Sequence, residues 1–145
     1  MLEPATISEA GFLRIESARA LEVCAGGSLE RFFGTVLEMR ATAAGKTLCV
    51  LLVPDEFQVE DDVWREVQAN LPGAQLERDR PQRLIVPWME REGIPCLDLL
   101  PVLRAAEPLA DGRRHVYHLR DTHFNARGNR IVGEALAEFL RPFLR

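Results

Sequence analysis

The order of apolar and polar residues along the chain predicts helices that alternate with buried strands. A helix is predicted from Ser28, a suitable N-cap, to Gly45, which tolerates the left-handed conformation that ends helices. Its apolar residues recur at three- and four-residue spacing: Leu29, Phe32, Phe33, Val36 and Leu37. The next segment, TLCVLLVP at 47–54, is continuously apolar, as is typical of a parallel strand covered on both faces.

The rest of the chain continues this alternation. Helices are predicted over 59–71 and 81–92, a second buried strand over 93–100, and a long amphipathic helix over 126–144. The first 27 residues are open to either a short helix or a strand. Alternating helices and strands predict an α/β protein, but two strands are about half of an ordinary sheet.

Length and composition predict one globular domain spanning residues 1–145. The chain has 145 residues, 47% of them hydrophobic and 28% charged, with a net charge of −4. This charge argues against nucleic acid or an anionic membrane as the main partner. No signal sequence or membrane-spanning run is visible, so we expect a soluble chain of unknown compartment. Three cysteines without a CxxC pair suggest neither a zinc site nor disulfides.

The residues with a possible catalytic or helix-capping role lie just before the last predicted helix. Asp121, His123 and Asn125 occupy alternate positions there. Asn125 is placed to cap the helix, and Asp121 is close enough to accept a hydrogen bond from the Nδ1 of His123. Such a bond leaves Nε2 free as a base. The pair would then supply the base of a hydrolytic triad and the carboxylate that orients it. The alternative is that both side chains only satisfy backbone amides of the loop.

The segment YHLRDTHFNARGNRIVGEALAEFL resembles the C-terminal block of the SGNH (GDSL-type) hydrolases, in the branch with a D-x-H-[WF]-N pattern. Asp121 and His123 match the catalytic Asp and His of that branch, and Asn125 and Gly128 match the helix start. GKTLCVLLVPDEFQV and EREGIPCLDLLPVLR also look like family segments, so the resemblance covers roughly 30–145. This chain departs from the wider family in having D-x-H instead of D-x-x-H.

The resemblance implies the C-terminal half of a three-layer α/β/α flavodoxin-like fold with few parallel strands. It also implies ester hydrolysis or O-acyl (O-acetyl) transfer on a small acyl ester or acylated carbohydrate, without a cofactor. The family's G-D-S block and its oxyanion-hole blocks are missing. Ser28 is a possible substitute nucleophile, although an N-cap explains it as well. We therefore expect a truncated domain, inactive alone, in which His123 serves a serine from elsewhere. A homodimer, or association with the missing N-terminal half, would cover the open sheet.

Other residues are open to more than one interpretation. Asp55 and Gln58 follow the first strand, where ligands bind in parallel sheets, and could line a substrate pocket or simply start a helix. Asp98, at the end of the second strand, has the same two explanations. A metal site including His115 and His118 is an alternative, but these side chains would point to opposite faces of an extended segment, so no metal ligand is assigned. A non-catalytic interaction domain is the other alternative.

Overall fold

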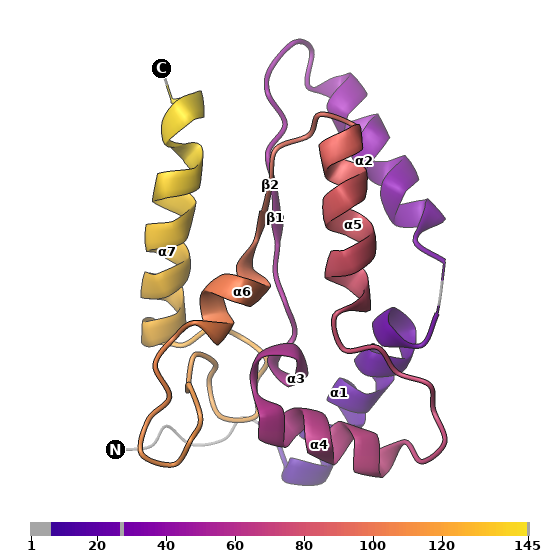
Figure 1. The fold of residues 1–145 in the computed structure, drawn as a ribbon, viewed down its shortest axis with the longest axis vertical. Coiled ribbons are helices and arrows are strands. Elements are labelled where there is room, and N and C mark those ends of the chain that lie inside the picture. Colours follow the sequence, from indigo (N-terminus) through magenta and orange to yellow (C-terminus); the bar gives the residue numbers. More distant parts are fainter. Residues whose placement is uncertain (1–6, 27, 145) are drawn as a thin grey trace.

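In the computed structural model, residues 7–26 and 28–144 are described, and they form a mixed α/β structure that is mostly helical (Figure 1). In chain order the elements are α1 (Glu9–Cys24), α2 (Glu30–Thr42), β1 (Val50–Leu52), α3 (Glu56–Val59), α4 (Asp61–Asn70), α5 (Arg80–Arg91), β2 (Cys96–Asp98), α6 (Leu99–Arg104), α7 (Ala126–Leu140) and the 3₁₀ turn η1 (Arg141–Phe143). No helix in the described part of the chain is both long and apolar enough to cross a membrane.

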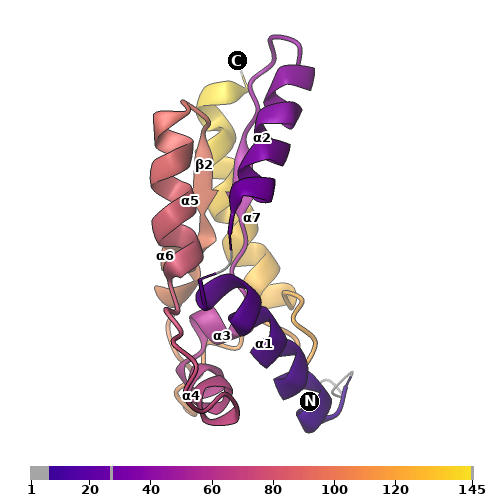
Figure 2. The same ribbon diagram turned by 90° about the vertical axis from the view of Figure 1, so that its right-hand side faces the viewer.

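The two strands form a parallel sheet between helices. Val50 lies opposite Cys96, and Leu52 lies opposite Asp98. Helices α2 and α5 cover one face of the sheet, and α7 runs along the other face (Figures 1 and 2). Both strands run toward α3 and α6, so their carboxyl ends meet at the same end of the molecule.

The sheet is covered more completely on one face than on the other. Val50 and Leu52 pack against the cluster formed with α2 and α5. The alternate residues Leu51 and Val53 are 36% and 53% exposed, whereas Leu97 of the neighbouring strand packs with α7. The prediction that 47–54 is covered on both faces is therefore wrong for β1, because α7 packs beside β2 and leaves β1 open.

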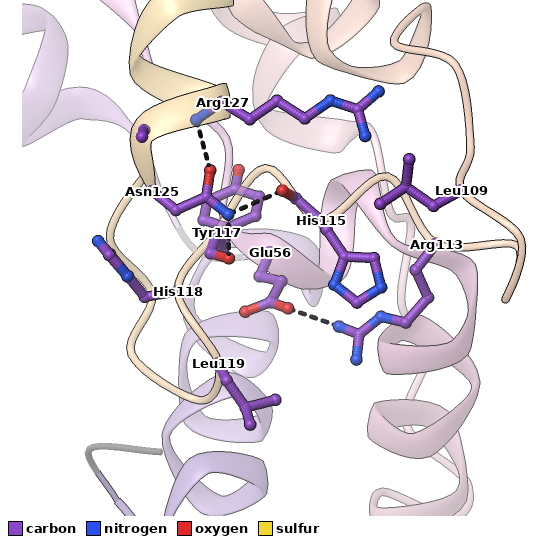
Figure 3. A pocket seen from close by; sticks show the side chains of 10 residues that line it. Glu56, Leu109, Arg113, His115, Tyr117, His118, Leu119, Asn125 and Arg127 are labelled. Carbon is purple, nitrogen blue, oxygen red and sulfur yellow. Dashed lines mark hydrogen bonds and ion pairs between the residues drawn. The ribbon is translucent and has the colours of Figure 1, made fainter. Parts of the chain in front are cut away.

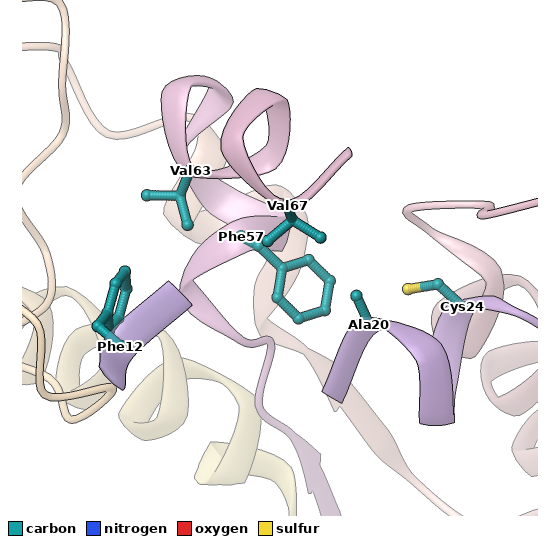
Figure 4. Close-up of a cluster of buried hydrophobic side chains, with 6 residues drawn as sticks. All are labelled: Phe12, Ala20, Cys24, Phe57, Val63 and Val67. Carbon is teal, nitrogen blue, oxygen red and sulfur yellow. The ribbon is translucent and has the colours of Figure 1, made fainter. Parts of the chain in front are cut away.

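Three apolar clusters hold the described elements together. One joins α1 to α3 and α4, through Phe12, Ala20, Cys24, Phe57, Val63 and Val67 (Figure 4). A second joins α6, α7 and the loop between them, and the third joins α2, α5 and the sheet. The first cluster shows that the segment left open between helix and strand is a helix, because Phe12, Ala20 and Cys24 of α1 pack at helical spacing against α3 and α4.

The predicted helices are confirmed; α2, α4 and α7 are shorter than predicted, and α5 is shifted by one residue. The helix predicted from Ser28 to Gly45 is α2, and Gly45 has φ +81° in the turn that follows. Pro81 lies in the first turn of α5, where its missing N–H costs no helical hydrogen bond. The long C-terminal helix ends at Leu140 and continues as the single turn η1. The sequence predicts no separate helix at α3, although a helix start at Asp55 and Gln58 is one of the two explanations given for these residues.

Candidate active site

The loop between α6 and α7, residues 105–125, lies at the carboxyl ends of both strands (Figure 1). Buried Tyr117 fixes it there: its hydroxyl donates to the carbonyl oxygen of Pro54, just after β1, at 2.9 Å. Tyr117 also forms an isolated antiparallel bridge with Phe124, and the two rings lie 5.0 Å apart. Ligands of parallel sheets bind at this end of the strands, so the loop has the position that a site would need.

Glu60 anchors the middle of the loop. Its carboxylate, in a residue only 1% exposed, accepts hydrogen bonds from the backbone N–H groups of Arg114 and His115, both at 2.9 Å. A buried charge is tolerated when it is hydrogen-bonded in this way. His115 has φ +49°, an uncommon value that these bonds help to hold. Nothing in the sequence marked Glu60, because the partners lie more than fifty residues away.

Asn125 fastens the end of the loop to α7. Its Oδ1 accepts from the backbone N–H groups of Arg127 at 2.9 Å and Gly128 at 3.0 Å, which confirms the predicted helix cap. Its Nδ2 donates to the carbonyl oxygens of His115 at 2.8 Å and Tyr117 at 2.9 Å. All the hydrogen-bonding groups of one side chain therefore hold the loop against the helix start.

Asp121 and His123 form a hydrogen-bonded pair on this frame. The Nδ1 of His123 lies 2.6 Å from Oδ1 of Asp121 and 2.9 Å from its carbonyl oxygen. The hydrogen bond to the Asp121 carboxylate raises the pKa of His123. The backbone between and before them is bent tightly, with φ +55° at Arg120 and φ +62° at Thr122. A β-branched residue is rarely found at such a φ, and strain of this kind is often concentrated at functional sites.

The free edge of the His123 ring is open to solvent. Its side chain is 80% exposed, against 27% for Asp121. Among the described residues, its ring forms hydrogen bonds only with Asp121. Nε2 is therefore available to take a proton from a group outside the described part of the chain.

A second Asp–His pair in the same loop has the opposite orientation. Asp111 Oδ2 lies 2.6 Å from Nε2 of His115, and the hydrogen bond from His115 lowers the pKa of Asp111. In a hydrolytic triad the carboxylate binds Nδ1 and leaves Nε2 to face the nucleophile. Of these two pairs, only Asp121 and His123 have that arrangement.

The other predicted pocket residues take part in structural contacts. Asp55 forms an ion pair with Arg19 at 2.8 Å, and burial raises the pKa of its carboxyl group despite this pairing. Gln58 is 3% exposed; its Nε2 donates to the carbonyl oxygen of Arg78 and to Oε1 of Gln82, both at 2.9 Å. Its Oε1 accepts from the backbone N–H of Asp55 at 3.2 Å. A role for Asp55 and Gln58 in substrate binding stays a prediction.

Ser28 and Asp98 both serve helix starts. The Ser28 hydroxyl accepts from the backbone N–H of Glu30 at 3.2 Å, and Asp98 Oδ1 accepts from that of Leu100 at 2.9 Å. Neither is hydrogen-bonded to the His123 ring. The N-cap of α2 is Leu29, so the prediction of Ser28 as N-cap is wrong by one position, although the Ser28 hydroxyl still binds the first N–H of the helix.

Sequence reasoning missed a group of buried carboxylates beside the loop. Glu16 and Glu56 are 0% and 3% exposed. Burial raises the pKa of Glu16 to about 7 and that of Glu56 to about 8, and the negative charges of neighbouring carboxylates add to the shift. Each keeps one carboxylate oxygen without a hydrogen-bond partner. In the sequence they look like ordinary exposed acidic positions, Glu16 in the middle of a helix and Glu56 at the start of one.

No group of three or more His, Cys, Asp or Glu side chains in the described ranges is arranged to hold a metal ion. The metal alternative therefore has no geometric support from these residues. When the chain was compared with protein-family models, with curated proteins and with solved structures, nothing matched.

Proposed function

We propose that this chain is the C-terminal part of an SGNH/GDSL-type esterase or O-acyl (O-acetyl) transferase. The observation that carries the proposal is the 2.6 Å contact between Asp121 Oδ1 and His123 Nδ1, with Nε2 exposed, at the carboxyl ends of two parallel strands. This arrangement supplies a base and the group that orients it.

The proposed chemistry follows from the orientation of the ring. Nε2 of His123 takes the proton of a serine hydroxyl as that oxygen attacks the ester carbonyl. The imidazolium is stabilised by the Asp121 carboxylate, and it then returns the proton to the departing alkoxide. Water, or the hydroxyl of an acceptor such as a carbohydrate, attacks the acyl-serine in the second half of the reaction. The steps need no cofactor.

The serine and the oxyanion-hole donors would come from outside the described residues, in which no serine is hydrogen-bonded to His123. The exposed side of β1 supports the proposal that the chain is one part of a larger enzyme. Leu51 of β1 and Val53, the residue just after it, are exposed, and β1 has an unpaired edge in the described sheet that favours addition of another strand. In the complete three-layer fold, the missing half would cover this surface.

The experiment that tests the proposal begins with the coding DNA upstream of Met1. If a G-D-S strand block lies there in frame, the extended chain should hydrolyse a short-chain fluorogenic ester. His123→Ala should abolish turnover in that chain, and His115→Ala should preserve most of it because the Asp111–His115 pair has the wrong orientation. The proposal fails if the extended chain is inactive, if no such block exists, or if His123→Ala retains full turnover.

A non-catalytic interaction domain is the second candidate, favoured by the exposed side chains of Leu51 on β1 and of Val53 just after it. A self-associating or partner-binding domain would use this surface while Asp121 and His123 kept only a structural role. Sedimentation of the 145-residue chain tests self-association: a dimer that Val53→Lys dissociates supports it, and a monomer at high concentration contradicts it.

A further inference from the structure

A cavity of about 430 Å³ lies between α3, the 105–125 loop and the start of α7 (Figure 3). Its volume is within the range of small-molecule sites. Neither Asp121 nor His123 lines it, although Tyr117 and Asn125, which hold the loop of the candidate active site, do. The side chains that matter for its chemistry are Glu56, Leu109, Arg113, Tyr117, Leu119 and Arg127.

Glu56 lies in the middle of the ring of lining side chains (Figure 3). Its Oε1 accepts from Nη2 of Arg113 at 2.8 Å, while Oε2 is buried and has no hydrogen-bond partner in the described part of the chain. Buried carboxylate oxygens in native structures almost always have a partner. Burial raises the pKa of Glu56 to about 8, so this oxygen accepts from a donor on a bound molecule when the carboxyl group is ionised, and a bound cation would favour that form.

The charged groups around Glu56 favour a ligand whose hydrogen-bond donor is also a cation. Glu16, Glu60 and Asp62 all act on Glu56 with the same negative sign, and Arg113, its only ion-pair partner among the described residues, also contacts Asp62 at 3.3 Å. Carboxylates therefore outnumber cations around the Glu56 side chain. A ligand ammonium group at Oε2 would reduce this excess, whereas an anion there would increase it.

The opposite wall of the cavity sets the polarity of the ligand. Arg127 donates from Nη1 to the carbonyl oxygen of Arg114 at 2.8 Å and from Nη2 to that of Glu107 at 2.6 Å. These neutral partners leave its positive charge uncompensated, so a second ligand cation is disfavoured there. The rest of the wall includes the apolar side chains of Leu109, Tyr117 and Leu119 together with His115 and His118, and its apolar part suits an uncharged alkyl body.

We propose that this cavity binds a small primary amine, with the ammonium group on Glu56 Oε2 and a short alkyl body against Leu109, Tyr117 and Leu119. The proposal is independent of the proposed esterase function, since it involves neither Asp121 nor His123. Because the frame of the loop is fixed by Asn125 and Glu60, the cavity exists before the ligand arrives.

The test is a titration of the 145-residue chain with n-butylammonium, followed by NMR shifts of the cavity residues, with n-butanol and n-butyrate as matched probes. We expect saturable binding of butylammonium and at least tenfold weaker binding of the other two. Equal or tighter binding of butyrate or butanol, or no saturable binding of butylammonium, overturns the proposal.

Two variants locate the site. Glu56→Gln should weaken butylammonium binding at least tenfold. Ala126→Phe should do the same by filling the cavity, and it keeps the proposal testable if Glu56→Gln fails to fold, because Ala126 is exposed and makes no contact with the Glu56–Arg113 pair. Glu134→Gln, on the exposed side of α7, is the charge-matched control and should bind normally. Unchanged affinity in a folded Glu56→Gln or in Ala126→Phe contradicts the proposal.

Discussion

Gly128 is the position at which the loop and α7 approach most closely, and its replacement by alanine is the sharpest test of this packing. A Cβ at residue 128 would lie 2.1 Å from the carbonyl oxygen of Val116 and 3.2 Å from Cβ of Phe124. Gly128 is itself buried, and Val116 is 0% exposed. The glycine is required here by the close approach of two backbone segments, not by an unusual φ.

The expected cost is large because the obstructing atom is a backbone oxygen with a partner of its own. Val116 O accepts from the backbone N–H of Asn125 at 3.1 Å, so moving it away breaks that bond. Overpacking in a core typically costs about 1–3 kcal/mol, a lost hydrogen bond costs about 1 kcal/mol, and the helical preference of alanine returns about 1 kcal/mol. We expect Gly128→Ala to lower the free energy of unfolding by about 1–3 kcal/mol, equivalent to a Tm decrease of roughly 2–12 °C.

The same helix provides the control. Gly133 has no neighbour within 4 Å of the position that a Cβ would occupy. Gly133→Ala should therefore stabilise the protein by about 1 kcal/mol, because alanine loses less backbone entropy in a helix. Urea unfolding followed by circular dichroism at 222 nm measures both variants. If the two substitutions shift the unfolding midpoint in the same direction, the close approach at Gly128 does not exist.

Three further predictions concern the site and its surroundings. Asp121→Asn should lower the pKa of His123 toward its ordinary value in an NMR titration, whereas Asp111→Asn should leave that pKa unchanged. Asn125→Ala removes a helix cap and two donors to loop carbonyls, and it should cost about 2–3 kcal/mol by urea unfolding; a loss below about 0.5 kcal/mol would mean that the loop is held by other contacts. Burial raises the pKa of Glu16 to about 7, so its contribution to stability is present at low pH and is lost as the pH rises through that value. Glu16→Gln should therefore flatten the decrease of unfolding free energy between about pH 5 and 8, and an unchanged slope in urea titrations would contradict this.

The helices could be predicted from the sequence because their signals are local. The periodic apolar residues of α7 and its Asn125 cap lie within one stretch of chain, and both are confirmed. The state of residues 9–24 could not be decided in the same way. Its apolar face is defined by contacts with α3 and α4, which are far along the chain, and the sequence pattern alone suits more than one structure.

The coverage of the sheet was harder to predict for a related reason. A continuous apolar run indicates burial on both faces, but whether a helix reaches each face depends on where α7 crosses. In the structure α7 packs on Leu97, and Val53 stays 53% exposed. The apolar run at β1 then indicates a surface that another polypeptide could cover, and this is the physical basis of the proposed association.

In the candidate site, too, the features that depend on local contacts could be predicted, and those that depend on long-range contacts could not. Asp121 and His123 are two residues apart, so their hydrogen bond could be proposed from spacing alone. Glu56 and Glu60 could not be assigned, because an acidic residue after a strand looks solvated until the chain from residue 113 to 115 folds over it. Buried carboxylates are rare, and the sequence gives no sign of the backbone amides that make them possible.

The groups that hold the loop of His123 in place all lie in the described part of this chain. Tyr117 ties the loop to β1, Glu60 ties it to α3, and Asn125 ties it to α7. The imidazole should therefore keep its hydrogen bond to Asp121, and its raised pKa, in the isolated 145-residue protein. Assembly with a serine-bearing partner would then add the reacting group to a base that is already oriented, and would require no rearrangement of the loop.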